Sequence, residues 1–288
     1  MLRSLNSGVS GIQQFQERLD VIGNNIANSN TIAFKSARAD FADAFSETLQ
    51  GSTPGLNGQA ATPAMQIGSG VTTSGIQNIF TQGVLNSTGV KTDLGIAGDG
   101  FFTVKDPVSG IEYATRAGDF RPDENGHLVT NDGFRVQGFS DSALSTRGDI
   151  QIDGTGRPAA ASPTASMVGF NIDPDGKITV QLSDGTQFVR GQVLLQRFSD
   201  PQALEKEGEN LYSGISSAGP LGGNGSPQSQ APSTNGLGRV QAGRLELSNV
   251  DLTTEFADLI TTQRAFQANA RIITTSDEVL QDVINLKR

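Results

Sequence analysis

The sequence predicts an α+β protein in which paired, coiled-coil-forming helices at the two termini enclose a mainly-β body. The 288 residues begin and end with stretches whose apolar positions recur at alternating steps of three and four. That spacing is typical of helices that pack along a seam. Between them lie short apolar alternations separated by Gly, Asn and Asp, as in strands joined by hairpin turns. The 35 Gly and 11 Pro residues also favour many turns.

The first helix is predicted from Leu2 to about Ile26. Its apolar positions, at nearly heptad spacing, are Leu2, Leu5, Val9, Ile12, Leu19, Ile22 and Ile26. Four Asn residues between positions 24 and 30 are expected to end it, because Asn competes for backbone hydrogen bonds and favours turns.

The next part of the chain carries a weaker pattern. Residues 34–49 place Phe34, Phe41 and Phe45 at intervals that fit a helix or an extended chain, and both remain open. Residues 51–70 are rich in Gly, Pro, Ser and Thr without an apolar period. We expect them to form an extended or irregular linker.

The β body is predicted to begin near Val71. The strands expected before Ser140 are residues 101–104, 112–115, 127–129 and 134–136, with hairpin turns at 98–100, 124–126 and 131–133. Residues 141–166 match no regular pattern. Strand character returns at 169–172, 177–182 and 192–197, with a turn at 173–176. Residues 214–238 form a second Gly/Ser/Pro linker, followed by strand-like residues 240–247.

The last helix is predicted from Ser248 to Arg288. Its heptad positions are Leu252, Phe256, Leu259, Gln263, Phe266, Ala270, Ile273, Asp277, Leu280 and Ile284. One amphipathic helix cannot bury its own seam, so we expect it to pair with the N-terminal helix and with the same helices of other copies. The polar Gln263 and Asp277 are expected to set the register of that seam.

The residues predicted to pack between helices and subunits come from both termini. They are Leu5, Val9, Ile12, Leu19, Ile22, Ile26, Leu252, Phe256, Leu259, Phe266, Ile273, Leu280 and Ile284. The predicted domains are a terminal helical domain (1–30 and 248–288), an extended linker region (31–75) and a mainly-β outer domain (76–240), with a further division near 141–166.

The composition excludes most catalytic chemistry. The chain has no Cys, and His127 is its only histidine, so neither a catalytic triad nor a transition-metal site is expected. The turns at 119–125 and 173–176 lack the ligand spacing of a calcium loop. Gly98-Asp99-Gly100 leads into a strand, not the helix of a dinucleotide site. We expect no catalytic residue, cofactor, metal or small-molecule substrate.

Charge and hydropathy further limit which functional classes of protein the chain can belong to. A net charge of −9 argues against nucleic acid as a partner. No apolar run reaches the ~20 residues that span a bilayer, and the N-terminus lacks the pattern of a cleaved signal peptide. Paired terminal helices around a β body point to an assembly module.

Four stretches resemble the axial proteins of the bacterial flagellum, the hook and rod family. Together they cover both ends and much of the middle of the chain in the family's order. They are residues 19–28 with 33–36, residues 81–83 with 93–102, residues 113–120 with 125–133, and residues 248–252 with 263–269 and 286–288.

The resemblance implies that many copies stack helically into a hollow tube on the cell surface. Terminal helices would line its channel and β domains would form its wall. It also implies type III export without a cleaved signal peptide. Residues 272–288 and 34–36 most resemble a short hook protein, a curved universal joint, with the distal rod protein, a straight drive shaft, as the alternative. The implied partners are other copies, the rod and hook–filament junction proteins, the hook cap and the export apparatus.

Overall fold

The structure is a computed structural model in which contacts divide the chain into two compact units. Unit 1 comprises residues 1–29, 36–79 and 250–288, and unit 2 comprises residues 30–35 and 80–249. The described residues are 2–52, 54, 63–158, 161–162, 164–221 and 229–286. The predicted α+β class, with a helix at each end and a mainly-β body, is confirmed.

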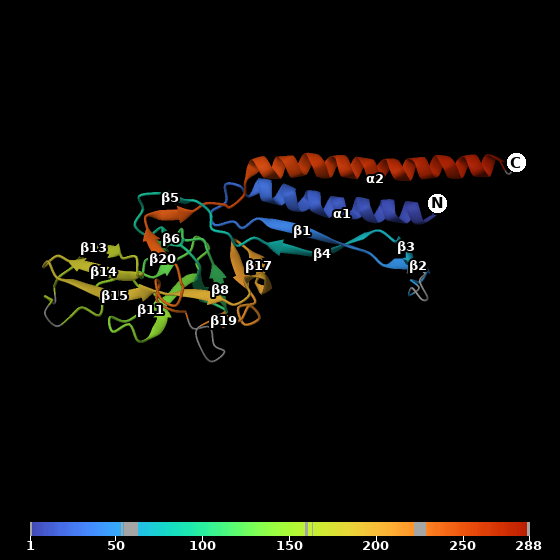
Figure 1. Ribbon diagram of the computed structural model, residues 1–288. Coiled ribbons are helices and arrows are strands. Elements are labelled where there is room, and N and C mark those ends of the chain that lie inside the picture. The colour runs from blue at the N-terminus through green and yellow to red at the C-terminus, as the bar shows by residue number, and fades with distance from the viewer. Residues whose placement is uncertain are drawn as a thin grey trace. The chain divides into compact units, whose positions relative to one another are not determined.

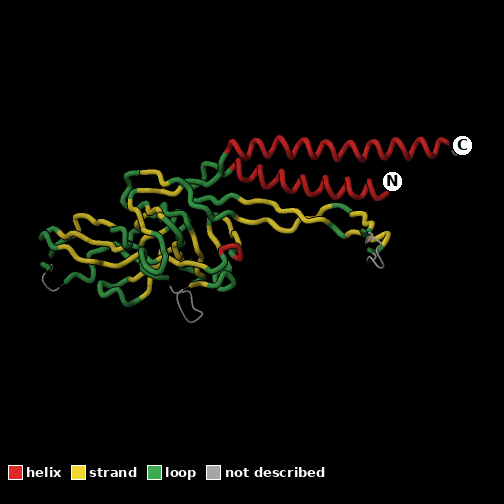
Figure 2. The backbone as a smooth tube through the Cα atoms, viewed as in Figure 1, coloured by secondary structure: helices red, strands yellow, loops and turns green. Residues whose placement is uncertain are grey.

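Unit 1 contains the two helices and four strands. Its elements are α1 (Leu2–Ala27), α2 (Leu252–Leu286), β1 (Ala37–Asp43), β2 (Ser46–Gln50), β3 (Met65–Gly68) and β4 (Val71–Asn78). The helices lie side by side and antiparallel, α1 in blue and α2 in red (Figure 1). On its other side α1 packs against the ribbon that β1 and β4 form, which Figure 2 shows in yellow. Strands β2 and β3 pair in the continuation of this ribbon.

Helix α2 begins where the sequence supplies a cap. The Asp251 carboxylate accepts hydrogen bonds from the Thr253 backbone N–H (2.9 Å) and the Thr254 hydroxyl (3.1 Å). Such a side chain satisfies a backbone donor that the first helical turn leaves free. These hydrogen bonds lower the pKa of Asp251, first of all the one from Thr253. The predicted start at Ser248 is therefore early, because residues 248–251 lead into the helix.

Unit 2 contains the remaining strands and the short helix η1 (Pro201–Ala203). The strands are β5 (Leu85–Ser87), β6 (Leu94–Ala97), β7 (Phe101–Lys105), β8 (Glu112–Thr115), β9 (Arg121–Pro122), β10 (Leu128–Val129), β11 (Arg135–Phe139), β12 (Arg147–Asp149), β13 (Met167–Ile172), β14 (Lys177–Leu182), β15 (Gln187–Val193), β16 (Leu195–Phe198), β17 (Glu205–Gly208), β18 (Leu211–Ser213), β19 (Pro220–Leu221), β20 (Arg239–Ala242) and β21 (Arg244–Glu246).

Most of these strands form one antiparallel sheet. Its main path runs β13-β14-β15-β11-β7-β8-β18-β17. The last two strands pair back to the first two, β20 with β6 and β21 with β5. The main core is apolar and includes Phe102, Val104 and Leu128, all fully buried. Pairing of β21 with β5 brings Glu246 next to the start of the body.

Both segments predicted as linkers contain a strand that pairs with another strand. In residues 51–70, β3 pairs with β2, whereas residues 53 and 55–62 lie outside the described residues. In residues 214–238, β19 pairs with β16, and Ala218 and Leu237 are buried; residues 222–228 are not described. The described residues of 51–70 are extended or irregular, as expected, with β3 fully exposed, whereas 214–238 also contribute buried residues to unit 2.

Three further segments bear on the sequence predictions. Residues 34–49, which fitted helix or strand, are extended and pair with a partner strand along β1 and β2. Residues 141–166, which matched no pattern, contribute β12 and the buried Ile150 and Ile152. The expected linker region 31–75 is divided between the units, since 30–35 belong to unit 2.

Replacing Gly118 by Ala should destabilise unit 2. A β-carbon there would lie 1.7 Å from the Leu94 carbonyl oxygen, which belongs to the backbone and cannot turn away. The free energy of unfolding should fall by at least about 2 kcal/mol, the usual cost of overpacking. Chemical denaturation followed by circular dichroism measures it.

Gly169→Ala is the matched control. Its β-carbon would meet no atom within 4 Å, and Ala is favoured over Gly within a strand. Its midpoint should stay unchanged or rise slightly. Equal midpoints for the two variants would contradict the crowding at Gly118.

Candidate functional site

Helices α1 and α2 approach each other closely where α1 carries glycine. A β-carbon on Gly11 would lie 2.7 Å from Nδ2 of Asn269, and one on Gly8 would lie 3.3 Å from Cγ1 of Ile273. Both glycines are buried. The missing side chains therefore allow the close contact between the helices.

The seam of α2 that faces α1 alternates apolar and small or polar side chains. One column holds Leu259, Phe266, Ile273 and Leu280, all partly buried. The adjacent, likewise shielded column holds Glu255, Thr262, Asn269 and Ser276. The two columns together keep the alternating steps of four and three that a packed helix requires.

Gln263 and Asp277, expected in this seam, are exposed, so that expectation is wrong for the helix pair within the chain. On a helix, positions three and four residues away both neighbour a given residue. Apolar residues alone favoured the column containing Phe256 and Ala270. The close approach at Gly8 and Gly11 instead places α1 over the column on the other side of Leu259.

The thirteen predicted packing residues take three kinds of position. Ile22 is buried, at 4% exposure. Partly buried are Leu5, Ile12, Leu19, Ile26, Leu259, Phe266, Ile273 and Leu280. Exposed are Val9, Leu252, Phe256 and Ile284. The structure thus brings the first two groups together within unit 1 and leaves the third on its surface.

Helix α2 exposes large apolar side chains along its length. Phe256 is 50% and Ile284 64% exposed. The other exposed members of this apolar surface are Leu252, Ile260, Ile272, Val279, Val283 and Leu286. These exposed side chains are available for contact with another chain.

Asn25 joins three elements of unit 1. Its buried side-chain amide donates to the Ala37 carbonyl (2.8 Å) and to Oε1 of Glu255 (3.0 Å), and its carbonyl accepts from the Ala37 N–H (2.9 Å). Burial raises the pKa of Glu255, against the lowering effect of the bond from Asn25. The residue that helps to end α1 therefore also fixes β1 and α2 against it.

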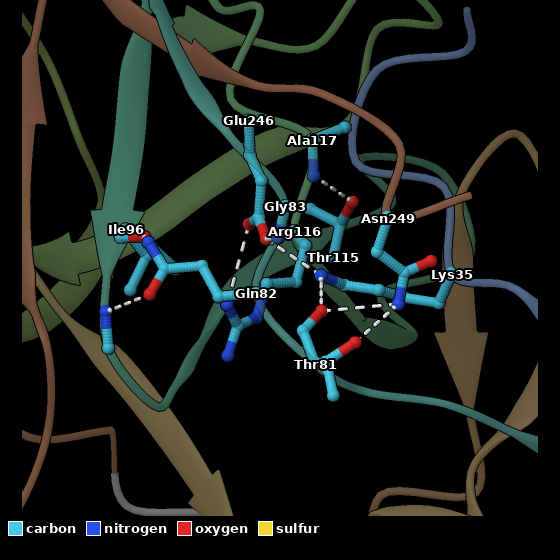
Figure 3. A network of polar contacts seen from close by, with 11 residues as sticks. Lys35, Thr81, Gln82, Gly83, Ile96, Thr115, Arg116, Ala117, Glu246 and Asn249 are labelled. Atoms are coloured by element: carbon cyan, nitrogen blue, oxygen red, sulfur yellow. Dashed lines mark hydrogen bonds and ion pairs between the residues drawn. The ribbon is translucent and has the colours of Figure 1, made fainter. Parts of the chain in front are cut away.

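A second polar site lies inside unit 2 and centres on the buried carboxylate of Glu246 (Figure 3). It accepts hydrogen bonds from Nζ of Lys35 at 2.7 Å and from the backbone N–H of Gly83 at 2.8 Å. Nη1 of Arg116 lies 3.4 Å from its other oxygen. Lys35 Nζ donates as well to the Thr81 carbonyl, at 2.8 Å.

Backbone contacts complete this cluster. The N–H of Ala33 donates to the Glu246 carbonyl at 2.8 Å, and the N–H of Asn249 to the Phe34 carbonyl at 3.3 Å. The Asn249 amide donates to the Thr81 hydroxyl at 2.9 Å. These residues stand next to the points where the chain passes between units, at 35/36, 79/80 and 249/250. The cluster therefore fixes the ends of unit 2.

Burial governs the electrostatics of this cluster. It lowers the pKa of Lys35 below its ordinary value, while Glu246 acts in the opposite sense by favouring the charged amine. Burial likewise raises the pKa of the neighbouring Tyr212. A buried ion survives only when it is paired and hydrogen-bonded, and Glu246 meets this condition through two cations and a backbone donor.

Within the described residues, neither a metal-binding cluster nor a membrane-spanning helix is present. No group of three His, Cys, Asp or Glu side chains in the described ranges could hold a metal ion. None of the described helices is long and apolar enough to cross a membrane. The turn at 173–176 closes through the Gly176 N–H and the Asp173 carbonyl, 2.8 Å apart, as a hairpin requires.

Sequence reasoning missed Gly8, Gly11, Asn25, Lys35 and Glu246 as functional positions. The spacing of apolar residues does not predict such positions, because each acts through a contact with a part of the chain far away in sequence. The available signals were the two glycines inside a helical pattern, which are otherwise unfavourable there, and the lysine beside Phe34.

Three models of flagellar protein families match segments of the chain. They are described as flagella basal body rod protein (residues 5–35), flagellar hook protein FlgE/F/G D1 domain (95–180) and flagellar basal body rod FlgEFG protein C-terminal (241–286). The chain is 40% identical to the flagellar basal-body rod protein FlgG of Bacillus subtilis, over the whole of both chains. Identity to FlgG of Agrobacterium fabrum is 35%, over 99% of this chain and all of the relative.

A helix at each end and a β body between them define a protein built to assemble. The chain belongs to the family of flagellar rod and hook proteins, which are structural proteins. The flagellar hook protein FlgE of Borreliella burgdorferi is also similar, with 26% identity over an alignment of 449 positions that covers both chains fully.

Glu246→Gln should strongly destabilise unit 2. The change removes the charge that two buried cations share, and leaving such charges unpaired costs about 3–5 kcal/mol. Denaturant unfolding at neutral pH measures it.

The double variant Lys35→Met/Glu246→Leu removes one buried charge of each sign and should recover part of that loss. Arg135→Gln is a matched control, since Arg135 pairs with Asp149 at 2.8 Å and both side chains reach solvent, at 34% and 27% exposure, where a pair contributes about 1 kcal/mol. Equal losses for Glu246→Gln and Arg135→Gln would contradict the role of the cluster.

The free energy of unfolding of unit 2 should fall at alkaline pH because Tyr212 ionises more readily in the unfolded chain. Its folded pKa is raised by burial above the ordinary 10.0, so the unfolded chain loses this proton first. The contribution is complete below pH 10 and is lost as pH rises towards the folded pKa. The chain has two Tyr and no Trp, so ultraviolet absorbance can follow tyrosine ionisation. Tyr212→Phe should reduce the alkaline loss and Tyr113→Phe should not; the reverse would refute the assignment.

Proposed function

We propose that the chain is a structural subunit of the distal rod of the bacterial flagellar basal body, assembling with many copies of itself into a straight hollow tube that transmits torque. The similarity to FlgG rod proteins along the entire length of both chains carries this proposal. The sequence motifs alone led us to expect a short hook protein, with the distal rod protein as the alternative. The full-length similarity favours the distal rod protein.

The comparison with the hook protein explains this choice. That alignment spans 449 positions, far more than the 288 residues of this chain, and its identity is lower. The resemblance of 34–36 and 272–288 to hook proteins concerns motifs that the rod proteins share. Short motifs at the termini therefore identify the family, and full-length agreement separates its members.

The exposed apolar surface of α2 supports assembly through the helices. Helix α2 has 35 residues and α1 has 26, a difference of about 13 Å at 1.5 Å per residue. Its C-terminal end extends past the first residues of α1 (Figure 1) and carries Val279, Val283, Ile284 and Leu286. In the tube, we propose, helices of neighbouring copies cover this surface, as the heptad spacing suggests.

The remaining proposals follow from membership of an axial assembly. The chain acts as a mechanical element and not as an enzyme. It works in the basal body after export by the flagellar type III apparatus. Its neighbours are other copies of itself and the adjacent rod and hook proteins.

Phe256→Asp should prevent tube formation while leaving both units folded, because Phe256 is half exposed and lies outside the seam with α1. Burying such a side chain contributes about 1.5–3 kcal/mol, so the polymerisation threshold should rise at least tenfold. Gln267→Asp, which introduces the same charge at an exposed polar position, should leave it nearly unchanged. Electron microscopy and sedimentation of the purified full-length chain at rising concentration measure both.

The shape of the wild-type polymer tests the proposed member of the family. Straight tubes of indefinite length agree with a rod. Curved tubes would instead support the assignment as a hook protein, and rings of limited copy number would favour a junction protein. Tubes formed equally well by Phe256→Asp would contradict the role of the α2 surface.

A further inference from the structure

A pocket opens in unit 2 beside the Glu246 cluster. Its volume is about 230 Å³, and three aromatic rings and two guanidinium groups line it, from Phe80, Phe101, Phe198, Arg116 and Arg197. Gly100, Asp99, Ser199 and Pro201 complete the lining. On the same measure a single water needs only about 10–15 Å³, so a carboxylate on a short aliphatic stem fits in this space.

The cluster behind the pocket carries more positive than negative charge. Lys35 and Arg116, both buried, share the one carboxylate of Glu246. Tyr212 supplies no anion, since burial keeps its hydroxyl protonated. Buried charge without a partner is costly, so the cluster favours an added anion.

Arg116 connects this cluster to the pocket. It is 3% exposed and lines the pocket wall. Its guanidinium lies over the Phe101 ring, 5.2 Å from the centroid, while Nη1 points to Glu246 (Figure 3). Its Nε has no hydrogen-bond partner among the described residues. A guanidinium has five N–H donors, and one carboxylate does not satisfy them.

The carboxylate at the rim of the pocket does not complete the cluster. Asp99 is 4.0 Å from Nη2 of Arg197, at the limit of an ion pair, and its side chain is 72% exposed. The Arg197 side chain is 41% exposed, and among the described residues its other hydrogen bond goes to the Asn235 carbonyl, at 3.5 Å. The two arginines therefore remain available to a ligand.

We propose that this pocket is a carboxylate-binding site, and that in the assembled tube an Asp or Glu side chain of a second copy fills it. Arg116 and Arg197 bind the carboxylate, because a guanidinium fork matches its two oxygens. The three Phe rings surround the aliphatic stem. The identification of the occupant rests on the proposed polymer, whereas the site itself does not.

Charge favours a second copy as the source. The chain carries 30 Asp and Glu against 21 Lys and Arg, so a neighbouring copy presents mainly carboxylates. A pocket with two arginines on such an acidic protein is complementary to the rest of its own surface. Complementary charges of this kind set the register of an interface more than its affinity.

The site is tested first on the full-length chain, kept below its polymerisation threshold. Propionate, the side-chain analogue of Glu, is titrated while ¹⁵N NMR follows the Nε–H signals of the arginines. Propionate should shift the Arg116 and Arg197 signals saturably, and neutral propionamide should not. Arg197→Gln should weaken binding about tenfold, the loss expected for a charged hydrogen bond, and Asp99→Asn should not weaken it.

An absent or non-saturable shift, or an equal response to propionamide, would overturn the site. Signals that move in Arg135 as much as in Arg116 would also overturn it, because Arg135 is already paired with Asp149 outside the pocket.

The second-copy occupant is tested by competition during polymerisation. At matched ionic strength, propionate should raise the polymerisation threshold of the wild type, and propionamide should not. The Arg197→Gln variant should have a raised polymerisation threshold even when neither propionate nor propionamide is added. Propionate that binds the monomer but leaves the threshold unchanged would identify a free carboxylate as the ligand and overturn the second-copy assignment. A chain that forms no tube at all would refute the proposed function, and the monomer titration would still decide the site.

Discussion

The buried carboxylate of Glu246 is the constraint on which unit 2 depends. It lies at the end of β21, late in the chain, yet its ligands come from Lys35 and Gly83, more than 160 positions earlier. A buried anion must be matched, so the fold is complete only when both terminal portions of unit 2 are in place.

Unit 1 is held together by close packing of its two helices rather than by a buried charge. Its seam uses Gly8 and Gly11 to bring α1 close to α2, and small or polar residues fill alternate positions. Large apolar residues such as Phe256 and Ile284 consequently remain outside. Their exposure is consistent with a subunit whose helices find their final partners in other copies.

Much of the secondary structure was predictable, and much less of the site. The strand predicted at 177–182 coincides with β14, and α1 was placed to within a residue or two of its observed end. Residues 141–166 were not predictable, because the buried Ile150 and Ile152 directly follow β12, a strand of three residues that is too short to show an apolar period. Glu246 and Arg116 carried no local signal, and Lys35 carried only its place beside Phe34, since a salt bridge between distant positions leaves no spacing in the sequence.

The sequence alone determined the α+β class, the helix at each end, the hairpin turns and the absence of thiol chemistry. Each of these depends on neighbouring residues: the period of apolar side chains, the turn preferences of Asn, Asp and Gly, or composition. Only the tertiary structure decided which column of α2 faces α1, because both columns next to Leu259 satisfy the helical period. It also decided that Lys35 and Arg116 share Glu246, since burial and pairing exist only once distant segments meet.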